Sequence, residues 1–502
     1  MVGAGLGGLS VAARLGTLGH QVTVCEQASE VGGKLATYSR DGFTFDTGPS
    51  LLTLPAVYRD LFIKTGAPIE DVLEIVPVDP TCRYRFADGT WLNMPNASRT
   101  KIAQAFDDGL GAGAGQDWNR FMDRAGRIWQ ATRGPFLESP LEGLGRLARQ
   151  SGSLGDITTI APWRTLRGLG RHYLRDPRLR TYLDRYATYT GSDPRRAPAA
   201  LAVVPYVEQT FGAWYVQGGM RRLGEAVRER ALQRKVAIRT GADVTTILTE
   251  AGRATGVRLA GGEEIPADLV VANADAEHLY TDLVSAPKAL AALRRATPSL
   301  AGFVMLLALH GRTPHSGVRA HHTVLFPERY DDEFDAIFSR SARPVPDPTV
   351  YVSAPDDPAL RPDADSEAWF VLVNAPRHRA QDHGDRGDQG DRGTGVDWDT
   401  PGLAARYADQ VLALMAHRGL DARDRLLWRE IRTPADLERA TRAPGGSIYG
   451  TSSNGVRAAF LRPANRSPVP GLFLVGGSAH PGGGLPLVGL SAAIVADLIG
   501  PA

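Results

Sequence analysis

Apolar side chains recur near the N-terminus in a pattern that predicts one helix followed by one strand. Four of them fall at helical spacing: Leu9, Ala12, Ala13 and Leu18. Residues 21–25 then alternate in the manner of a strand, and the strand ends at Glu26. A helix that leads directly into a strand is typical of an α/β sheet.

The middle of the chain passes from a helical pattern to a strand pattern. Residues from about 99 to 234 are mostly helical, and one face collects Trp118, Phe121, Met122, Ala125, Ile128 and Trp129. We interpret this face as plain helix packing. After a helix predicted over 223–232, strand-like runs follow at 236–239, 244–248, 257–259 and 267–274.

Further strand-like runs and a terminal helix complete the pattern. The runs lie at 303–309, 350–352 and 369–373, within a region that we expect to form a sheet with covering helices. A buried strand predicted near 472–475 enters a glycine turn, and a helix is predicted from about 487 to 499.

The loop before the first helix carries a glycine pattern with a specific physical use. Gly3, Gly5 and Gly8 fit G-x-G-x-x-G, which combines a tight turn, close backbone approach to a pyrophosphate and close helix–sheet packing. Glu26 ends the next strand, where a carboxylate would bind a ribose hydroxyl. A loop that merely turns the chain is the alternative, and it leaves Glu26 unexplained. The pattern therefore predicts a dinucleotide site.

One part of this motif is short in the sequence. Only Met1 and Val2 precede Gly3, whereas about four to six apolar residues would normally form the central strand. We therefore expect that the start is assigned too late or that the chain is truncated.

Composition narrows the classes of protein that need to be considered. A length of 502 residues suggests two to three domains, and a net charge of +2 gives no argument for nucleic-acid binding. Cys25 and Cys82 cannot form a disulfide framework, so a reducing cytoplasm is the default location. No signal peptide and no apolar run long enough to cross a bilayer is present.

Two further motifs carry a family resemblance. The resemblance is carried by residues 3–26, by Gly32-Gly33 and by the run Phe45-Asp46-Thr47-Gly48-Pro49. Through these residues the chain resembles the flavin-dependent amine oxidase superfamily, and most of all its bacterial-type phytoene desaturases. A Gly-Gly-Met turn at 218–220 also fits. The resemblance covers nearly the whole chain. It implies FAD and not NAD, because a nicotinamide enzyme has no use for the second glycine pair. It also implies that the FAD is bound non-covalently.

The resemblance also implies an architecture. The expected fold is α/β (α+β overall), with a Rossmann-like FAD-binding domain that includes a β-meander, a mixed-sheet substrate domain and a helical, membrane-facing subdomain. We assign residues 1–75, 219–285 and 455–502 to the FAD-binding domain and residues 76–98 and 286–454 to the substrate domain. Residues 99–218 form the helical subdomain.

The family's cofactor contacts transfer to positions at both ends of this chain. By resemblance, Gly32, Gly33 and Lys34 follow the pyrophosphate, although arginine is commoner than lysine there, and Val244 contacts the adenine through its backbone. The expected cofactor-binding residues are Gly3, Gly5, Gly8, Glu26, Gly32, Gly33, Lys34, Gly48, Val244, Gly476, Gly477, Leu487 and Val488. The terminal helix would point its positive end at the flavin ring and so favour the reduced form.

The implied chemistry is the desaturation of a hydrophobic polyene. Hydride passes to flavin N5 and a proton leaves the neighbouring carbon, so alignment and water exclusion are the main tasks of the protein. His480 is a candidate proton acceptor, but a histidine that only holds the glycine turn explains it at least as well, and we leave the catalytic residues open. No metal ligands are needed. The electron acceptor, oxygen or quinone, also stays open.

An insoluble substrate implies peripheral contact with a membrane. Between 161 and 190, apolar residues are interleaved with seven arginines: Arg164, Arg167, Arg171, Arg175, Arg178, Arg180 and Arg185. This segment fits contact with an anionic bilayer surface and a solvated arginine face equally well. With the apolar run 198–207, it is the expected contact. The predicted location is cytoplasmic and peripherally membrane-associated.

Several other functions remain open on the same fold. An amine or protoporphyrinogen oxidase is one, but no cysteine follows Cys82 for covalent attachment, and Tyr407 and Tyr449 are the only tyrosines after Pro401. A non-enzymatic prenyl-binding chaperone is disfavoured by the intact glycine motif. A carotenoid isomerase and a hydroxycarotenoid 3,4-desaturase are alternatives within carotenoid chemistry.

Two remaining features are interpreted as unrelated to binding. His310, His315, His321 and His322 lack metal-ligand spacing and are expected to be turn and surface histidines. The charged low-complexity segment 383–395 is expected to be a disordered surface loop.

Overall fold

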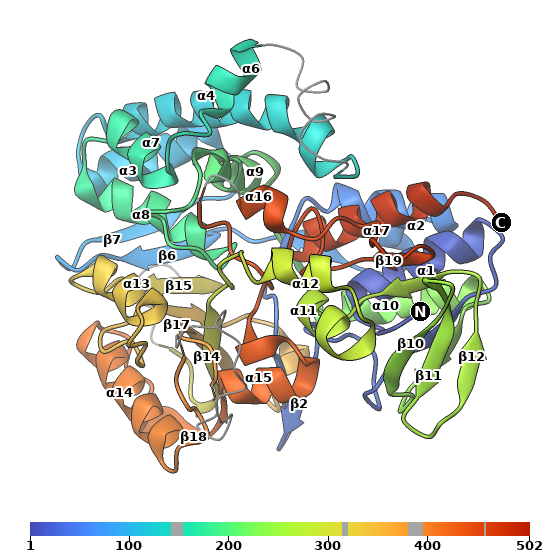
Figure 1. Ribbon diagram of the computed structural model, residues 1–502. Helices are drawn as coiled ribbons and strands as arrows, with labels where there is room; N and C mark the ends of the chain where they lie inside the picture. Colours follow the sequence, from blue (N-terminus) through green and yellow to red (C-terminus); the bar gives the residue numbers. More distant parts are fainter. Residues whose placement is uncertain (142–153, 314–319, 380–394, 456–457) are drawn as a thin grey trace.

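The first sheet of the fold is parallel and is built around the N-terminus. A computed structural model describes residues 1–141, 154–313, 320–379, 395–455 and 458–502 (Figure 1). In it, β1 (Thr23–Cys25) pairs with β9 (Ala237–Arg239), and β13 (Val270–Ala272) pairs with β19 (Leu472–Leu474). Val2 lies between the two pairs and bridges to Cys25 and Ala272. The resulting order, β9-β1-Val2-β13-β19, is that of a Rossmann-type sheet.

The short central strand expected from the sequence makes its ladder bonds on both sides. The Val2 amide donates to the Val271 carbonyl at 2.9 Å, and the Asn273 amide donates to the Val2 carbonyl at 2.7 Å. On the other side, the Met1 carbonyl accepts from the Cys25 amide at 2.9 Å. Two residues are therefore enough to fix the register of the neighbouring strands at this point.

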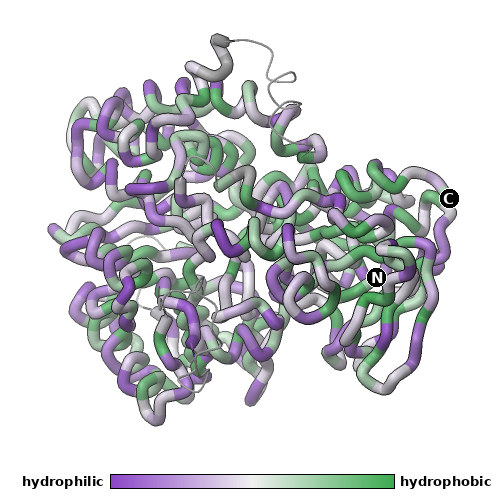
Figure 2. Tube along the Cα trace, viewed as in Figure 1, coloured by the Kyte–Doolittle hydropathy of each residue, from purple (hydrophilic) through white to green (hydrophobic). Residues whose placement is uncertain are grey.

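Helices cover this sheet and share its apolar core. They are α1 (Leu6–Thr17), α2 (Ala56–Thr65), α10 (Arg221–Gln233) and α17 (Leu485–Ile499). α1 packs against both α10 and α17, and buried residues such as Leu9, Val227 and Val495 belong to one cluster. The two chain ends lie on the same side of the molecule, and α17 is largely apolar along its length (Figures 1 and 2).

A three-stranded meander follows α10, as the sequence pattern predicts. It consists of β10 (Val244–Glu250), β11 (Arg253–Leu259) and β12 (Glu264–Pro266), all antiparallel. The chain also forms two small antiparallel sheets: β2 (Thr37–Arg40) with β3 (Phe43–Asp46), and β8 (Ala213–Val216) between β4 (Leu52–Thr53) and β5 (Ile75–Pro77).

The largest sheet is mixed and has seven strands in the order β18-β14-β17-β16-β15-β6-β7. Their bounds are β6 (Cys82–Arg85), β7 (Trp91–Met94), β14 (Ala301–His310), β15 (His322–Leu325), β16 (Val350–Ser353), β17 (Ser366–Ala375) and β18 (Leu426–Arg432). Only the β15–β6 pair is parallel. The helices beside it are α13 (Tyr330–Phe338), α14 (Leu403–His417) and α15 (Pro434–Thr441). The strand runs predicted at 303–309, 350–352 and 369–373 all lie in this sheet.

A layer of helices caps one end of this sheet (Figure 1). It contains α3 (Arg99–Leu110), α4 (Ala114–Thr132), α6 (Leu154–Ile160), α7 (Leu166–Tyr173), α8 (Pro177–Thr188) and α9 (Val203–Phe211). All six residues of the apolar face predicted on α4 are buried, which confirms the interpretation as helix packing. Short helices α11 (Ala276–His278), α12 (Pro287–Leu293) and α16 (Ala458–Leu461) connect the layers.

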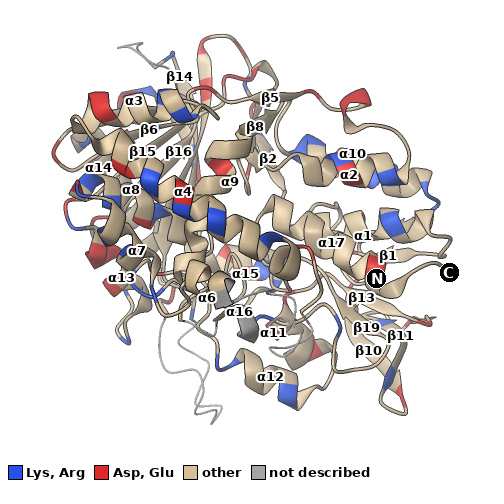
Figure 3. Cartoon of the chain, turned by 90° about the horizontal axis from the view of Figure 1, so that it is seen from above, with Lys and Arg blue, Asp and Glu red and all other residues tan. Residues whose placement is uncertain are grey.

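The arginine-rich segment of α7 and α8 is tied to carboxylates. Arg167 contacts Asp184 at 2.8 Å and Asp331 at 2.6 Å, and Arg175 contacts Asp117 at 2.9 Å. Basic and acidic side chains alternate over this layer (Figure 3). Most of the interleaved apolar residues face the core: Leu169, Leu174, Leu179, Leu183 and Tyr186. Among the described residues, no helix combines the length and apolar character that a transmembrane span requires.

The histidine expectation needs a correction. His310 ends β14 in an exposed position, but His322 is buried in β15 and stacks on Tyr351 with ring centroids 5.5 Å apart. His321 packs on Tyr215, and burial lowers its pKa to about 4. His322 is therefore an interior histidine, because β15 lies between two strands of the seven-stranded sheet, whereas His321 is half-buried in the bend that precedes it. His315 and the low-complexity residues 383–394 lie outside the described residues.

Candidate functional site

The N-terminal glycine loop brings backbone into contact with backbone. Gly5 precedes α1 without any side-chain cap, so the first N–H groups of the helix stay open to an anion. A Cβ atom on Gly8 would lie 2.3 Å from the Gly3 carbonyl oxygen, and Gly3 itself has a φ of +89°. The predicted glycines are thus required by close approach as well as by the turn.

Glu26 lies beside this loop at the end of β1 and is only 7% exposed. One carboxylate oxygen accepts from the Ala4 amide at 2.6 Å, and the other accepts from the Ala28 amide at 3.0 Å. A carboxylate offers about four acceptor positions, so capacity for a hydroxyl donor remains. Its place next to the glycine loop is the one that a ribose-binding acid occupies.

The second glycine pair and Gly48 complete the same layer. Gly5 and Gly32 form a parallel bridge, and a Cβ on Gly33 would lie 3.2 Å from the Gly5 Cα. A Cβ on Gly48 would lie 1.8 Å from the Lys34 carbonyl oxygen, so no larger residue fits there without movement of the backbone. These contacts place Gly5, Gly32, Gly33 and Gly48 together.

Lys34 uses its ammonium group within the protein. Its Nζ donates to the Ile448 carbonyl at 2.7 Å and to the Ser447 carbonyl at 3.1 Å, and burial lowers its pKa. Lys34 therefore joins the second glycine pair to residues 447–448. Its expected contact with a pyrophosphate stays a prediction.

The two ends of the chain meet at Gly7. A Cβ on Gly7 would lie 3.2 Å from the Gly476 Cα and 3.1 Å from the Val488 Cγ1. Leu487 and Val488 stand in the first turn of α17, which Gly484 precedes without a side-chain cap. The structure thus brings together two helix N-termini, each entered through glycine and each with free N–H groups. The carbonyl of Gly477, next along the turn, accepts from Arg462 at 2.7 Å.

Asn273 holds this meeting point together, and the sequence interpretation did not single it out. Its Nδ2 donates to the Val475 carbonyl at 2.9 Å. A Cβ on Gly476 would lie 2.3 Å from that nitrogen, and a Cβ on Gly5 would lie 2.7 Å from the Asn273 Oδ1. The available signal was its position near the end of the predicted strand 267–274. In the structure it directly follows β13, at the carboxyl edge of a parallel sheet.

Val244 lies on the Glu26 side of this region. It is buried at the start of β10, two residues after Ala242, whose amide donates to the Glu26 carbonyl at 2.8 Å. The backbone at Val244 therefore runs beside the acid expected at the ribose. Its predicted adenine contact is consistent with this position and stays a prediction.

We call the set Gly3–Gly8, Glu26, Gly32, Gly33, Gly48, Gly476 and Gly477 the glycine cradle. The cradle offers backbone N–H donors at two uncapped helix ends, and on its other side it offers one buried carboxylate, Glu26, as an acceptor. This combination fits a dinucleotide, whose phosphates are anionic and whose ribose offers hydroxyl donors.

Of the three ring side chains singled out in the sequence, His480 and Tyr449 lie at the C-terminal turn and Tyr407 does not. His480 is fully buried, its Nε2 lies 3.0 Å from the Ser139 carbonyl, and its Nδ1 has no partner among the described residues. Burial lowers its pKa to about 4, so the ring is neutral at pH 7. Tyr449 packs on Gly483, whereas Tyr407 bonds to the Val345 carbonyl in the core under α14.

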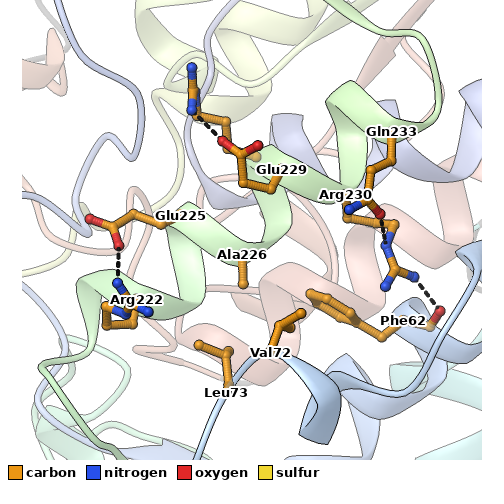
Figure 4. A pocket seen from close by; sticks show the side chains of 10 residues that line it. Phe62, Val72, Leu73, Arg222, Glu225, Ala226, Glu229, Arg230 and Gln233 are labelled. Atoms are coloured by element: carbon orange, nitrogen blue, oxygen red, sulfur yellow. Dashed lines mark hydrogen bonds and ion pairs between the residues drawn. The ribbon is translucent and has the colours of Figure 1, made fainter.

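A surface hollow of about 410 Å³ lies away from the cradle. It is lined by residues of α10, by Phe62 of α2, and by Val72 and Leu73 of the segment that follows α2. Figure 4 shows its charged rim, where Arg222 contacts Glu225 and Arg230 contacts Gln233 and the Phe62 carbonyl. None of the predicted site residues lines it.

Comparisons with known proteins give a consistent result. Residues 6–366 match the family described as flavin containing amine oxidoreductase. The chain is 34% identical over 507 residues to a 4,4'-diapolycopene oxygenase of Methylomonas sp, with 99% of this chain and 97% of that protein covered. It is 35% identical over 506 residues to a hydroxyneurosporene desaturase of Rubrivivax gelatinosus, with 99% and 92% covered.

Solved structures resemble this fold over its whole length. An oxidoreductase from Methanosarcina mazei has a TM-score of 0.61 at 17% identity, with 99% of both chains covered. A putrescine oxidase double mutant has a TM-score of 0.64 at 14% identity, with 99% of this chain and 98% of that chain covered. At such identities the likeness shows the fold alone.

Proposed function

The chain belongs to the flavin-containing amine oxidoreductase family and is an FAD-dependent oxidoreductase, and from this premise we propose that it desaturates a carotenoid precursor of the phytoene type. One carbon loses a hydride and the neighbouring carbon loses a proton, so that a new C=C bond forms between them. Bound FAD supplies the acceptor that takes the hydride at N5.

The observation that carries this proposal is the convergence of α1 and α17 at the contact of Gly7 with Gly476 and Val488. The uncapped end of α1 would hold the pyrophosphate and that of α17 would lie at the ring, and both would supply fixed positive partial charge to bound FAD. The full-length relatives named above act on carotenoids, and this supports the choice of substrate class. Non-covalent attachment is part of the proposal.

The residues around the turn perform positioning and proton transfer. Arg462 donates to the carbonyls of Tyr449 and Gly477, at 3.1 and 2.7 Å, and so holds the C-terminal turn against residues 449–451. If the hydrogen of neutral His480 is on Nε2, facing the Ser139 carbonyl, the Nδ1 lone pair is free to accept a proton. A weak base is adequate, because loss of hydride from one carbon makes the C–H bond of the neighbouring carbon strongly acidic.

Oxidation of a carotenoid that already carries oxygen is a second candidate function. The named relatives include a hydroxyneurosporene desaturase and a diapolycopene oxygenase, and neither name refers to phytoene. A 1-hydroxycarotenoid 3,4-desaturase of Flavobacterium sp. is 30% identical over 514 residues, with 99% of this chain and 98% of that protein covered.

We further propose that the protein draws its substrate from a membrane surface through the helical layer. Trp163 is 62% exposed and Phe211 is 39% exposed there, which supplies apolar contact groups beside the arginines. Cosedimentation with anionic vesicles tests this point. Reoxidation of the reduced enzyme by oxygen or by a quinone identifies the electron acceptor.

The decisive experiment is expression in cells that accumulate phytoene, with parallel strains that accumulate neurosporene and hydroxyneurosporene. We expect longer conjugated polyenes in at least one strain, and purified yellow protein that releases FAD on denaturation. Activity on amines or porphyrinogens with every carotenoid left unchanged would reject the proposal. A flavin-free protein that still binds prenyl chains would favour the chaperone function.

A further inference from the structure

A buried arginine without a carboxylate partner lies at the junction of the helical layer and the large sheet. Arg185, on α8, is 7% exposed. Its only hydrogen bond within the described residues joins Nη1 to the Thr188 Oγ1 at 3.0 Å, and its buried Nε has no partner. None of the ion pairs found among those residues includes Arg185.

Tyrosines surround this guanidinium. Its Cζ lies 5.4 Å from the Tyr189 ring centroid and 5.5 Å from that of Tyr351. Aromatic faces stabilise a cation, but they do not satisfy its N–H groups, which need acceptors in their plane. The buried acids in reach are occupied elsewhere: Glu208 accepts from the Tyr186 hydroxyl, and Glu333 accepts from Thr349 and Asn374.

The Arg185 cluster borders the glycine cradle through two contacts. Tyr351 bonds to Ser50, two residues after Gly48 of the cradle. On the other side, Gly191 follows α8 and packs on the Tyr449 ring, which in turn packs on Gly483 of the C-terminal turn. The Arg185 charge reaches Tyr449 as well: burial raises the pKa of Tyr449, and Arg185 opposes that shift.

A buried guanidinium whose Nε donates to no acceptor is costly unless a further group completes it. The acceptor that belongs beside a carotenoid site is an oxygen atom on an otherwise apolar chain. We propose that Arg185 binds a hydroxyl or carbonyl oxygen at one end of the polyene, so that the enzyme selects an oxygen-bearing carotenoid over the hydrocarbon. This inference rests on the second form of the proposed function, the oxidation of a carotenoid that already carries oxygen, and names the group that recognises that oxygen.

The test compares a matched pair of substrates, neurosporene and hydroxyneurosporene, in the wild type and in Arg185→Met. We expect the variant to lose roughly 10- to 100-fold in kcat/KM for the hydroxylated chain, which is the scale of a hydrogen bond to a charged group, and to retain its value for the hydrocarbon. Arg185→Lys should recover part of the loss. Arg423→Met removes an exposed arginine between α14 and β18, outside the helical layer and the cradle, and should change neither value.

A second measurement does not depend on turnover. A polyene aldehyde added to the wild type should absorb at longer wavelength than it does in detergent, because a cationic donor at the carbonyl oxygen stabilises the excited state. The shift should disappear in Arg185→Met. Absence of the shift in the wild type overturns the proposal even if the variant fails to fold.

Other outcomes also decide the question. Equal losses on both substrates, or a changed flavin reduction potential in Arg185→Met, would assign Arg185 to the flavin or to the scaffold and overturn the proposal. A wild type that oxidises neither polyene, but still shifts the aldehyde spectrum, would reject oxidation of an oxygen-bearing carotenoid as the function and retain the oxygen site.

Discussion

The glycine cradle and the Arg185 cluster lie close together but are built on opposite principles. The cradle works through backbone: Gly8 against Gly3, Gly48 against Lys34 and Gly7 against Gly476 leave no space for side chains. The Arg185 cluster works through side chains, with the guanidinium among the rings of Tyr189 and Tyr351. The cradle offers preformed backbone N–H groups, and the Arg185 cluster offers a buried guanidinium whose Nε has no partner.

This difference predicts different responses to mutation. A backbone site tolerates no added atom, because strands and helix ends must move together to make room. A side-chain site can lose a group while the fold persists, so its effects are confined to the ligand that the group contacts. Mutations that separate cofactor content from stability and from substrate choice therefore test the comparison.

The largest effect on flavin content is expected in the cradle. In Gly8→Val the new Cβ would lie 2.3 Å from the Gly3 carbonyl oxygen, so the loop and α1 must separate. We expect purified protein to retain less than roughly a tenth of the wild-type flavin, since overpacking there costs about 1–3 kcal/mol or more. Flavin absorbance per protein measures this. Gly261→Ala is the control, because no atom lies within 4 Å of its added Cβ, and normal flavin content in Gly8→Val would refute the steric argument.

The helical layer should respond in stability and leave the cofactor unchanged. Arg167→Met removes the partner of Asp184, whose pKa is raised to about 7 by burial even though Arg167 opposes the shift. Loss of one member of a buried pair costs about 3–5 kcal/mol. Chemical denaturation should show this loss against an Arg171→Met control, with flavin content per folded molecule unchanged. A drop in flavin content equal to the drop in stability would mean that the two regions are not separable.

The same contrast explains what the sequence predicted. The cradle could be located because its signals are local: a glycine spacing, a strand end at Glu26 and a C-terminal glycine turn before a helix. The comparisons confirm the family, the fold class and the flavin-dependent enzyme class that these motifs implied. The hydrogen bonds of Lys34 could not be predicted in the same way, because the carbonyl groups of Ser447 and Ile448 lie more than four hundred positions away in the sequence.

The Arg185 cluster could not be recognised in this way. Arg185, Ser50 and Tyr351 come from three distant segments, and no spacing relates them. Within α8, Arg185 looked like one more basic residue of a surface stripe, whereas the fold turns it inward and leaves Arg171 and Arg175 exposed. His321 and His322 were assigned to the surface for the same reason, because a short β15 offered no periodic signal of burial. The domain limits and the individual cofactor contacts stay predictions.

His480, in the C-terminal turn that follows Gly477 of the cradle, should make stability depend on pH. Its folded pKa of about 4 lies below the ordinary value of 6.5, mainly because of burial, so the unfolded chain binds more protons between these values. Stability therefore falls as pH drops from about 6.5 toward 4, by about 3 kcal/mol for this residue at most. Urea unfolding at several pH values should show a smaller decline in His480→Gln, while His321 and His322 contribute the remaining slope. An identical pH profile in the variant would show that His480 takes up a proton as easily in the folded protein as in the unfolded chain.

The smallest effect is expected at Asn273, which belongs to the cradle but acts through its side chain. Asn273→Ala removes the hydrogen bond to the Val475 carbonyl, a loss of about 1 kcal/mol, and leaves the glycine contacts in place. Flavin affinity should fall by less than roughly tenfold, which equilibrium dialysis or fluorescence recovery of released FAD can measure. The control Asn119→Ala removes an exposed amide that accepts from Arg99. If Asn273→Ala loses flavin as completely as Gly8→Val, the side chain is a cofactor ligand in its own right, and the cradle is less purely a backbone site than its glycines suggest.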